Sequence, residues 1–472
     1  MFFCYARSTK FASNRTSSDR AILILCFSIM PQDCGISFTM YYFKLRIAMA
    51  IISIPSSTTM FPMPQQVLRQ NREVVMAEEI GRARMLTLNR PNHLNYISGK
   101  VASTLGHNFE KYENDDSADF VIIKGTGRTF SAGGDLHMFY EERNTRDSCL
   151  EATYRMYWLC YHIHTYKKPH IALVHGMSVG GGASLMAPMK FSVVTEKAFS
   201  STPETNIGFH PDCGFSYMLP RLPGRLGEYL GLTGEKLRGK EVVAAGLATH
   251  FVPSQKLFQL EKRLLSIKSG DEDTIRSVIN EFSTNIHIDE RSILNKLSII
   301  NECFSKDSVE EIIESFEAES SRKGNDWIMP VLKSLKKASP TALKITLRSI
   351  REGRTQTISE CLRKEFRISM NIQRTIISGD FYEGIRAQII DKDKSPKWNP
   401  STLDKVHDDQ LDLIFKPFED HDLELQIPIK EEEEEEESRW RGKYENSSYS
   451  SPNQVNIQKA FRSMPSCESV LV

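Results

Sequence analysis

The stretch DFVIIKGTGRTFSAGGDL, residues 119–136, predicts a short buried strand followed by a glycine-rich turn. The same order returns in HIALVHGMSVGGGASL, residues 170–185, where a glycine triplet leads into a helical pattern. Two further apolar runs, ARMLTLN at 83–89 and KFSVVT at 190–195, are also strand-like. Because strands that alternate with helices form mainly parallel sheets, the chain from about Val74 predicts an α/β fold.

After about residue 255 the pattern of apolar residues changes. It shows helical periodicity as far as Arg386, and the polar loop DKDKSPKWNP follows at 391–400. Seven consecutive glutamates, Glu431–Glu437, repel one another and predict a disordered end. We therefore predict four parts, which are a leader or non-native extension over 1–71, a catalytic domain over 72–255, a helical region over 256–405 and an acidic disordered tail over 406–472.

Composition excludes several classes of protein. With 40% hydrophobic and 25% charged residues, the 472-residue chain is neither disordered nor collagenous. Sixty basic residues balance sixty acidic ones, which argues against a nucleic-acid coat, because such a protein needs a field of one sign. The nine cysteines show no C-x-x-C or Cys/His metal spacing, so we expect reduced thiols and no metal site.

The first seventy residues are poor in acids and contain arginine and serine, which fits a mitochondrial transit peptide. The apolar run Ala21–Met30 also fits a signal peptide, but at about half the length of a membrane span it predicts no transmembrane helix. A third interpretation treats residues 1–62 as an upstream extension, because the segment that begins at Met63 runs directly into a predicted strand. The sequence leaves these interpretations open.

Two pairs of features can carry chemistry. The turns at 130–135 and 180–182 let the backbone approach a ligand, and amides from two loops aimed at one oxygen form an oxyanion hole. Glu204 and Asp212 lie eight residues apart in a mostly apolar stretch, where a desolvated carboxylate is a candidate base, nucleophile or acid. Ordinary turn formation is the competing explanation for each feature taken alone.

Four motifs taken together resemble, in order and spacing, the signature loops of the enoyl-CoA hydratase/isomerase superfamily. They are LNRPNHLNYIS (88–98), TFSAGGDL (129–136), HGMSVGGGASL (175–185) and PETNIGFHPDCG (203–214). Later segments, including KASPTALKITLRSIREG at 337–353, resemble its 3-hydroxyisobutyryl-CoA hydrolase branch, and the resemblance covers about residues 72–405. It implies a crotonase-like α/β fold, a spiral of ββα units with a helical C-terminal region.

The resemblance also implies a site. The thioester oxygen would lie between the N–H groups of Gly134 and Gly181, and Glu204 and Asp212 would be the catalytic carboxylates. The residues implied to bind substrate or coenzyme A are Asn92, His93, Leu94, Ala132, Gly133, Asp135 and Gly180. No metal or further cofactor is implied, because coenzyme A arrives as part of the substrate.

The function implied is hydrolysis of an acyl-CoA thioester, 3-hydroxyisobutyryl-CoA in valine catabolism. A hydratase of this superfamily uses a second glutamate at the position of Ser184, so the chain keeps the carboxylate pair of the hydrolase branch. An enoyl-CoA hydratase or isomerase is the first alternative. An acyl-CoA binding protein with little activity is the second, because Met156 stands where the branch has a glutamate and His210 crowds the same region.

The resemblance leaves Glu204 as either a nucleophile that forms an anhydride or a base that activates water. Asp212 would contact the substrate hydroxyl or position water. The motif G-x-S-x-G at 176–180 also fits a nucleophile elbow with His250 as a base, but we expect the Ser178 hydroxyl to bond within its turn. Helical spacing of the aromatic residues near Tyr157 predicts core packing.

The expected partner is a small acyl-CoA substrate, with no nucleic acid and no membrane, and a homo-oligomer is possible in this superfamily. Relatives work in mitochondria or peroxisomes. The end Leu471-Val472 lacks a peroxisomal SKL-type signal, so the leader favours mitochondria.

Overall fold

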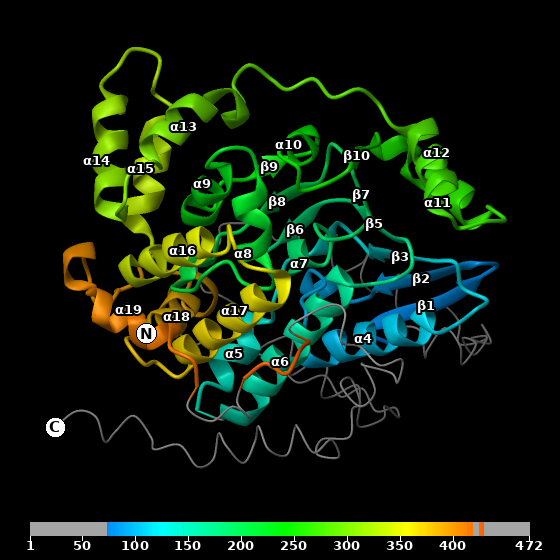
Figure 1. The fold of residues 1–472 in the computed structure, drawn as a ribbon, viewed down its shortest axis with the longest axis horizontal. Coiled ribbons are helices and arrows are strands. Elements are labelled where there is room, and N and C mark those ends of the chain that lie inside the picture. Colours follow the sequence, from blue (N-terminus) through cyan, green and yellow to red (C-terminus); the bar gives the residue numbers. More distant parts are fainter. Residues whose placement is uncertain (1–72, 145, 419–423, 429–472) are drawn as a thin grey trace, which may run out of the picture. The chain divides into compact units, whose positions relative to one another are not determined.

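The computed structural model describes residues 73–144, 146–418 and 424–428. All of them belong to one compact unit, Gln66–Val472, in which strand-rich and helical segments pack together (Figure 1). The expected leader over 1–71 and the glutamate run Glu431–Glu437 lie outside the described residues. Within the described part of the chain, no helix is long and apolar enough to cross a bilayer.

The larger of two sheets has six strands. Its spatial order is β1 (Val75–Ile80), β2 (Ala83–Leu88), β3 (Phe120–Gly125), β5 (His170–Val174), β7 (Phe191–Val194) and β10 (His250–Phe251). β1 and β2 form an antiparallel hairpin, and every later pairing is parallel. The α/β fold expected from the apolar runs is confirmed.

The smaller sheet grows from the same repeats. Its order is β4 (Thr129–Ser131), β6 (Met177–Val179), β8 (Phe199–Ser201) and β9 (Leu237–Arg238). β4, β6 and β8 pair in parallel, and each follows within a few residues a strand of the larger sheet. Consecutive strands of one repeat therefore enter different sheets, and the turns after the second strand meet on one side.

The larger sheet is covered on both faces, which explains its nearly continuous apolar strands. Side chains of β3 alternate between two cores, with Ile122 on one face and Ile123 on the other. The first face packs against α11 (Ser254–Leu265) and α12 (Glu272–Phe282). The second packs against α4 (Gly99–Glu113) and α6 (Arg146–His164), whose apolar residues fill the main core.

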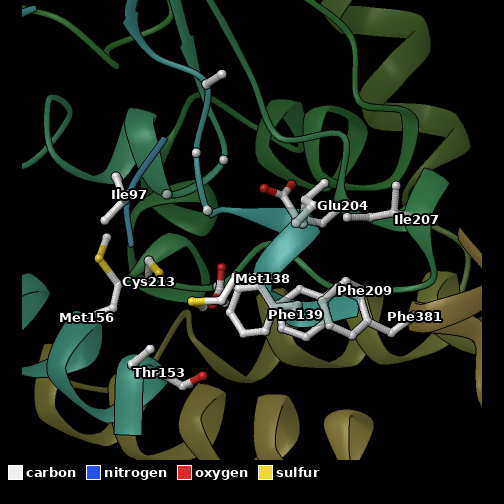
Figure 2. Close-up of a pocket in the computed structure, with 18 of the residues that line it drawn as sticks. Ile97, Met138, Phe139, Thr153, Met156, Glu204, Ile207, Phe209, Cys213 and Phe381 are labelled. Atoms are coloured by element: carbon white, nitrogen blue, oxygen red, sulfur yellow. The ribbon is translucent and has the colours of Figure 1, made fainter. Parts of the chain in front are cut away.

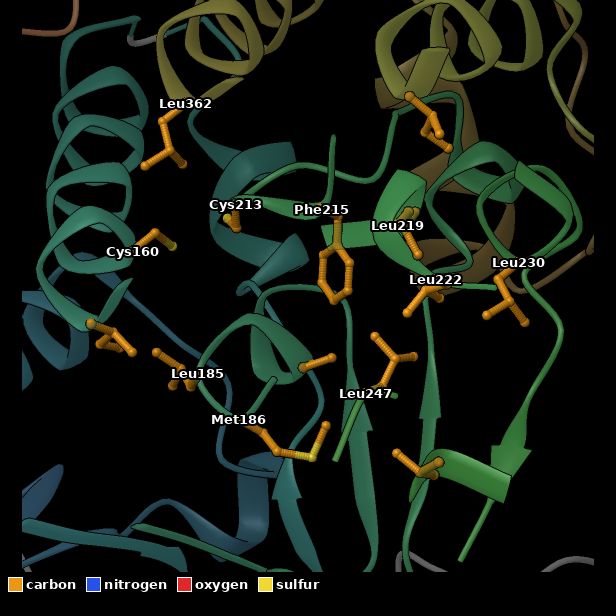
Figure 3. Packing of buried hydrophobic residues seen from close by; sticks show 14 of the residues in the cluster. Cys160, Leu185, Met186, Cys213, Phe215, Leu219, Leu222, Leu230, Leu247 and Leu362 are labelled. Carbon is orange, nitrogen blue, oxygen red and sulfur yellow. The ribbon is translucent and has the colours of Figure 1, made fainter. Parts of the chain in front are cut away.

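From Ser254 to Phe415 the chain is built from helices. After α11 and α12 they include the short α13 (Leu297–Cys303) and the longer α14 (Val309–Ser320), α15 (Ile328–Lys337), α16 (Pro340–Glu352) and α17 (Ile358–Gln373). α17 begins at a capping box in which the Thr357 hydroxyl accepts from the Glu360 amide and the Glu360 carboxylate accepts in return. It packs against α6 and α8, and Figure 3 shows Leu362 of α17 beside Cys160 of α6.

The remaining elements are short. They are α5 (Leu136–Glu141), α7 (Gly181–Ser184), α8 (Phe215–Met218), α9 (Leu226–Thr233), α10 (Lys240–Ala244), α18 (Asp380–Ile385), α19 (Asp408–Phe415), the 3₁₀ segments η1 (Pro91–His93), η2 (Glu204–Ile207), η3 (Leu219–Arg221), η4 (Ile293–Lys296) and η6 (Leu403–Lys405), and the π-helical η5 (Arg386–Ile390). A buried carboxylate on α9 ties this region to α16, because Glu228 pairs with Arg225, Arg351 and Arg354.

The prediction that disorder begins at residue 406 is wrong. Residues 408–415 form α19, whose Leu411 and Ile414 are buried against a cluster that includes residues of α17. Further along, Leu425 and Ile427 are buried, and Glu424 forms an ion pair with Arg367. Leu411, Ile414 and Phe415 have helical spacing, and α17 contributes Ile368 and Ile372 to the cluster that buries them.

Candidate active site

A cavity of about 370 Å³ opens where the turns of the smaller sheet meet α6, α17 and α18 (Figure 2). The walls are mostly apolar, with Ile97, Met156 and Phe381 among them. Seven of the residues expected from the sequence line this cavity, and they are Ala132, Gly133, Gly134, Gly180, Gly181, Glu204 and Asp212. Residues up to 292 positions apart in the chain, from Ile97 to Ile389, thus share one cavity.

The first glycine turn is fixed by backbone hydrogen bonds to the segment that precedes α4. The Ile97 amide donates to the Gly133 carbonyl at 2.9 Å, and the Asp135 amide donates to the Ile97 carbonyl at 3.2 Å. This parallel bridge leaves the Gly134 amide between them directed away from Ile97. Gly133 has a φ of +92°, and a Cβ there would lie 2.8 Å from the Val179 carbonyl oxygen.

The second glycine turn brings another amide to the same place. A Cβ built on Gly181 would lie 3.9 Å from the Gly134 nitrogen, so the two turns are in contact. Among the described residues, neither the Gly134 amide nor the Gly181 amide has a hydrogen-bond acceptor. Two adjacent unused donors at a cavity wall are suited to bind one oxygen that gains negative charge.

Glu204 begins η2 three residues after the end of β8, and only 7% of it is exposed. Its Oε1 would lie 2.6 Å from a Cβ on Gly180, so the carboxyl group reaches the second glycine turn. Its Oε2 is buried without a hydrogen-bond partner. Burial, followed by the nearby charge of Asp212, raises the Glu204 pKa well above its ordinary value.

Asp212 lies in the turn before α8, where Cys213 and Gly214 both have positive φ. The Tyr157 hydroxyl donates to Asp212 Oδ2 at 3.0 Å. Burial raises the Asp212 pKa to about 6, although hydrogen bonds from Cys213 and Tyr157 oppose this rise. Two carboxyl groups with raised pKa values in one cavity are suited to proton transfer or nucleophilic attack near neutral pH.

The other four expected binding residues lie outside the cavity lining. Asn92 and His93 are exposed on η1, and Leu94 follows them with a φ of +50°. Asp135 forms a 3.4 Å ion pair with Arg90. The Ala132 amide donates to the Leu94 carbonyl at 3.0 Å, so the segment after η1 adjoins the first glycine turn.

Ser178 has the local role expected of it. Its buried hydroxyl donates to the Gly182 carbonyl at 3.2 Å. His250, the base that a nucleophile elbow would need, instead has Nδ1 2.8 Å from the Thr249 hydroxyl. His210 is fully buried, and this burial lowers its pKa to about 3.

Sequence reasoning missed several residues at the site. Tyr157 was predicted to pack in the core, and it does, but its hydroxyl also contacts Asp212. Met156 stands beside the glycine turns, with its Cε 3.6 Å from a Cβ built on Gly181. Gln373 and Phe381 come from the helical region. No local pattern marks these residues, and only the departure at Met156 gave a signal.

The sequence model for enoyl-CoA hydratase/isomerase matches residues 83–415. The chain belongs to this family. The 3-hydroxyisobutyryl-CoA hydrolase-like protein 5 of Arabidopsis thaliana is 60% identical over 82% of this chain and 99% of its own length. The mitochondrial 3-hydroxyisobutyryl-CoA hydrolase of Homo sapiens is 40% identical over 75% of this chain and 91% of its own. Among solved structures, a carnitinyl-CoA dehydratase from Mycobacterium thermoresistibile has a TM-score of 0.67 at 30% identity, covering 74% of this chain and 97% of that one.

The family assignment confirms the crotonase-like fold. The names of the matching family and of the similar solved structure both refer to enzymes that act on CoA esters. Within the residues that the structure describes, no group of three or more His, Cys, Asp or Glu side chains is placed to hold a metal ion.

Proposed function

We propose that this family member hydrolyses an acyl-CoA thioester, with 3-hydroxyisobutyryl-CoA as substrate and 3-hydroxyisobutyrate and coenzyme A as products. The observation that carries the proposal is the placement of two unused amides, Gly134 and Gly181, in one cavity with the buried carboxyl groups of Glu204 and Asp212. The names of the similar hydrolases support the same substrate.

In the proposed reaction the thioester carbonyl oxygen accepts hydrogen bonds from the amides of Gly134 and Gly181. These donors stabilise the negative charge that develops when the carbonyl carbon is attacked. Glu204 either attacks this carbon, forming an anhydride as the thiolate leaves, or takes a proton from the attacking water. Asp212 contacts the substrate hydroxyl or positions water, and as a carboxylate it takes a proton from that water and passes it to the departing thiolate.

Ser184 favours hydrolysis over hydration of a double bond. It replaces the second glutamate of a hydratase, and its hydroxyl donates to the Gly181 carbonyl at 2.7 Å. Hydration needs two groups that deliver the elements of water, whereas hydrolysis of a thioester needs one base or nucleophile and a stabilised oxyanion.

The test measures thiol release from 3-hydroxyisobutyryl-CoA, 3-hydroxypropionyl-CoA and crotonyl-CoA. We expect cleavage of a 3-hydroxyacyl ester by the wild type, and a loss of about 10³-fold or more in kcat for Glu204→Gln and for Asp212→Asn. Ser178→Ala is the matched control and keeps its rate. Loss of the crotonyl double-bond absorbance without thiol release would instead show a hydratase, and binding of esters without turnover would show a binding protein.

A single turnover in ¹⁸O-labelled water separates the two roles of Glu204. If Glu204 attacks the thioester, the first product carries an unlabelled oxygen from its carboxylate, because water then cleaves the anhydride at the enzyme. If Glu204 activates water, the first product carries the label.

We also propose that the reaction needs no metal or cofactor beyond coenzyme A, and that the protein works in mitochondria. The second proposal rests on the acid-poor leader and on the mitochondrial location stated for the human relative. Unchanged thiol release after EDTA treatment tests the first. A fluorescent fusion of the full chain, compared with one that starts at Met63, tests the second.

A further inference from the structure

Four side chains form one hydrogen-bonded line behind the cavity. Ser369 of α17 is fully buried, and its Oγ lies 2.7 Å from the Tyr157 hydroxyl and 2.9 Å from His210 Nε2. Tyr157 continues the line to Asp212, with its hydroxyl 3.0 Å from Oδ2. The line therefore joins a residue of the helical region to a carboxylate at the proposed reaction centre.

The direction of every hydrogen bond in this line follows from its acidic end. An ionised carboxylate only accepts, so Tyr157 donates to Asp212. Tyr157 has no second proton, so its oxygen accepts from the Ser369 hydroxyl, and Ser369 in turn accepts from His210 Nε2–H. Because burial lowers the His210 pKa to about 3, its ring is neutral near pH 7 and carries the single proton that this arrangement requires.

α17 also holds the backbone of the same turn. Glu365 lies one helical turn before Ser369, and its two carboxylate oxygens accept from the amides of Gly214 at 2.7 Å and Ser216 at 2.6 Å. One face of α17 thus fixes both the backbone that follows Asp212 and the side chains that reach its carboxylate.

We propose that Ser369 is a positioning residue, which aligns the Tyr157 hydroxyl so that Asp212 Oδ2 stays a hydrogen-bond acceptor and Oδ1 is left for the reaction. This inference deepens the proposed function by assigning the two oxygens of Asp212 different roles. Ser369 acts through Tyr157 and does not itself line the cavity.

Several charged groups share this environment. Asp212 is faced by Glu204 from η2, by Glu365 from α17 and by the adjacent Cys213 thiol. The charge of Asp212 raises the pKa values of Glu204 and Glu365, and the Cys213 thiol lowers that of Asp212. His210 is influenced by the charge of Lys364 on α17. Since none of these groups is removed by a change at Ser369, an altered titration of Asp212 would report the hydrogen-bonded line.

The experiment titrates Asp212 by ¹³C NMR in protein labelled at aspartate Cγ, with Asp212→Asn used to assign the resonance. Tyr157→Phe removes the direct donor, so we expect it to raise the Asp212 pKa by about one unit or more. Ser369→Ala should raise this pKa by less, because Tyr157 keeps its hydroxyl but loses the donor that orients it. Ser359→Ala, at a buried serine on the same helix, should leave the titration unchanged.

Kinetics on the same proteins should show kcat lowered about tenfold in Ser369→Ala, with KM little changed and the acidic limb of the pH profile moved to higher pH. An Asp212 titration that is identical in wild type, Ser369→Ala and Tyr157→Phe would overturn the inference even if the wild type hydrolyses the ester. If the wild type cleaves no ester, the proposed function fails, and the NMR titration still decides whether Ser369 positions Asp212.

Discussion

Replacing Gly180 by alanine tests whether Glu204 is held where the structure places it. Gly180 has φ +53° and ψ −129°, a conformation that costs a residue with a side chain about 1–3 kcal/mol. The added Cβ would lie 2.6 Å from Glu204 Oε1, whereas ordinary contact begins near 3.4 Å, so the carboxylate must move by roughly 0.8 Å.

A displacement of this size at a reacting group is expected to lower kcat/KM by about 10²-fold, because a misplacement near 1 Å costs about that much. The assay is thiol release from the preferred ester, combined with urea unfolding to measure the free energy of unfolding. Strain should lower this free energy by about 1–3 kcal/mol.

Gly81→Ala separates strain from displacement. Gly81 has a similar φ of +57°, but a Cβ there would meet no atom within 4 Å. We expect it to lose stability without losing activity. If Gly180→Ala keeps kcat/KM within about threefold of the wild type, the position assigned to the Glu204 carboxylate during catalysis is refuted.

Three further predictions follow from burial and charge. The kcat/KM of the wild type should fall as the pH drops through an acidic limb at or above about 6. Asp212 and Glu204 both have raised pKa values, and both must be ionised to accept a proton or to attack. A flat profile of kcat/KM down to pH 4.5 would contradict this prediction. Glu228→Gln removes a fully buried charge from three partly exposed arginines, so the free energy of unfolding measured in urea should fall by about 2–3 kcal/mol with kcat unchanged. Met156→Ala widens the cavity beside Gly181. In competition between a longer and a shorter acyl-CoA ester, it should shift the ratio of their kcat/KM values by about tenfold towards the longer one. An unchanged ratio would show that Met156 does not contact the acyl group.

The features that the sequence predicts well are local. A buried parallel strand needs a continuous apolar run and a close turn needs glycine, so the segments at 119–136 and 170–185 indicate the α/β fold without reference to the rest of the chain. The two carboxylates, Glu204 and Asp212, also stood out because charged residues are rare in an apolar stretch. Their chemical roles came from the resemblance to a family.

The features that the sequence could not predict depend on contacts between distant segments. The helical spacing of the aromatic residues near Tyr157 is the same whether or not its hydroxyl donates a hydrogen bond to Asp212. The sequence therefore predicted only that Tyr157 packs in the core. The prediction of disorder from residue 406 failed for a related reason, since an acidic stretch remains solvated unless a surface such as that of α17 buries its few apolar residues.

The sequence alone therefore determined the strands, the two glycine turns and the presence of two acids after them. Only the tertiary structure decided which side chains surround those acids. Ser369 lies 212 residues from Tyr157 and 159 from His210, and no periodicity spans such separations. Packing of α17 against α6 and α8 sets these contacts, because a hydrogen bond requires its atoms within about 3 Å whatever their distance along the chain.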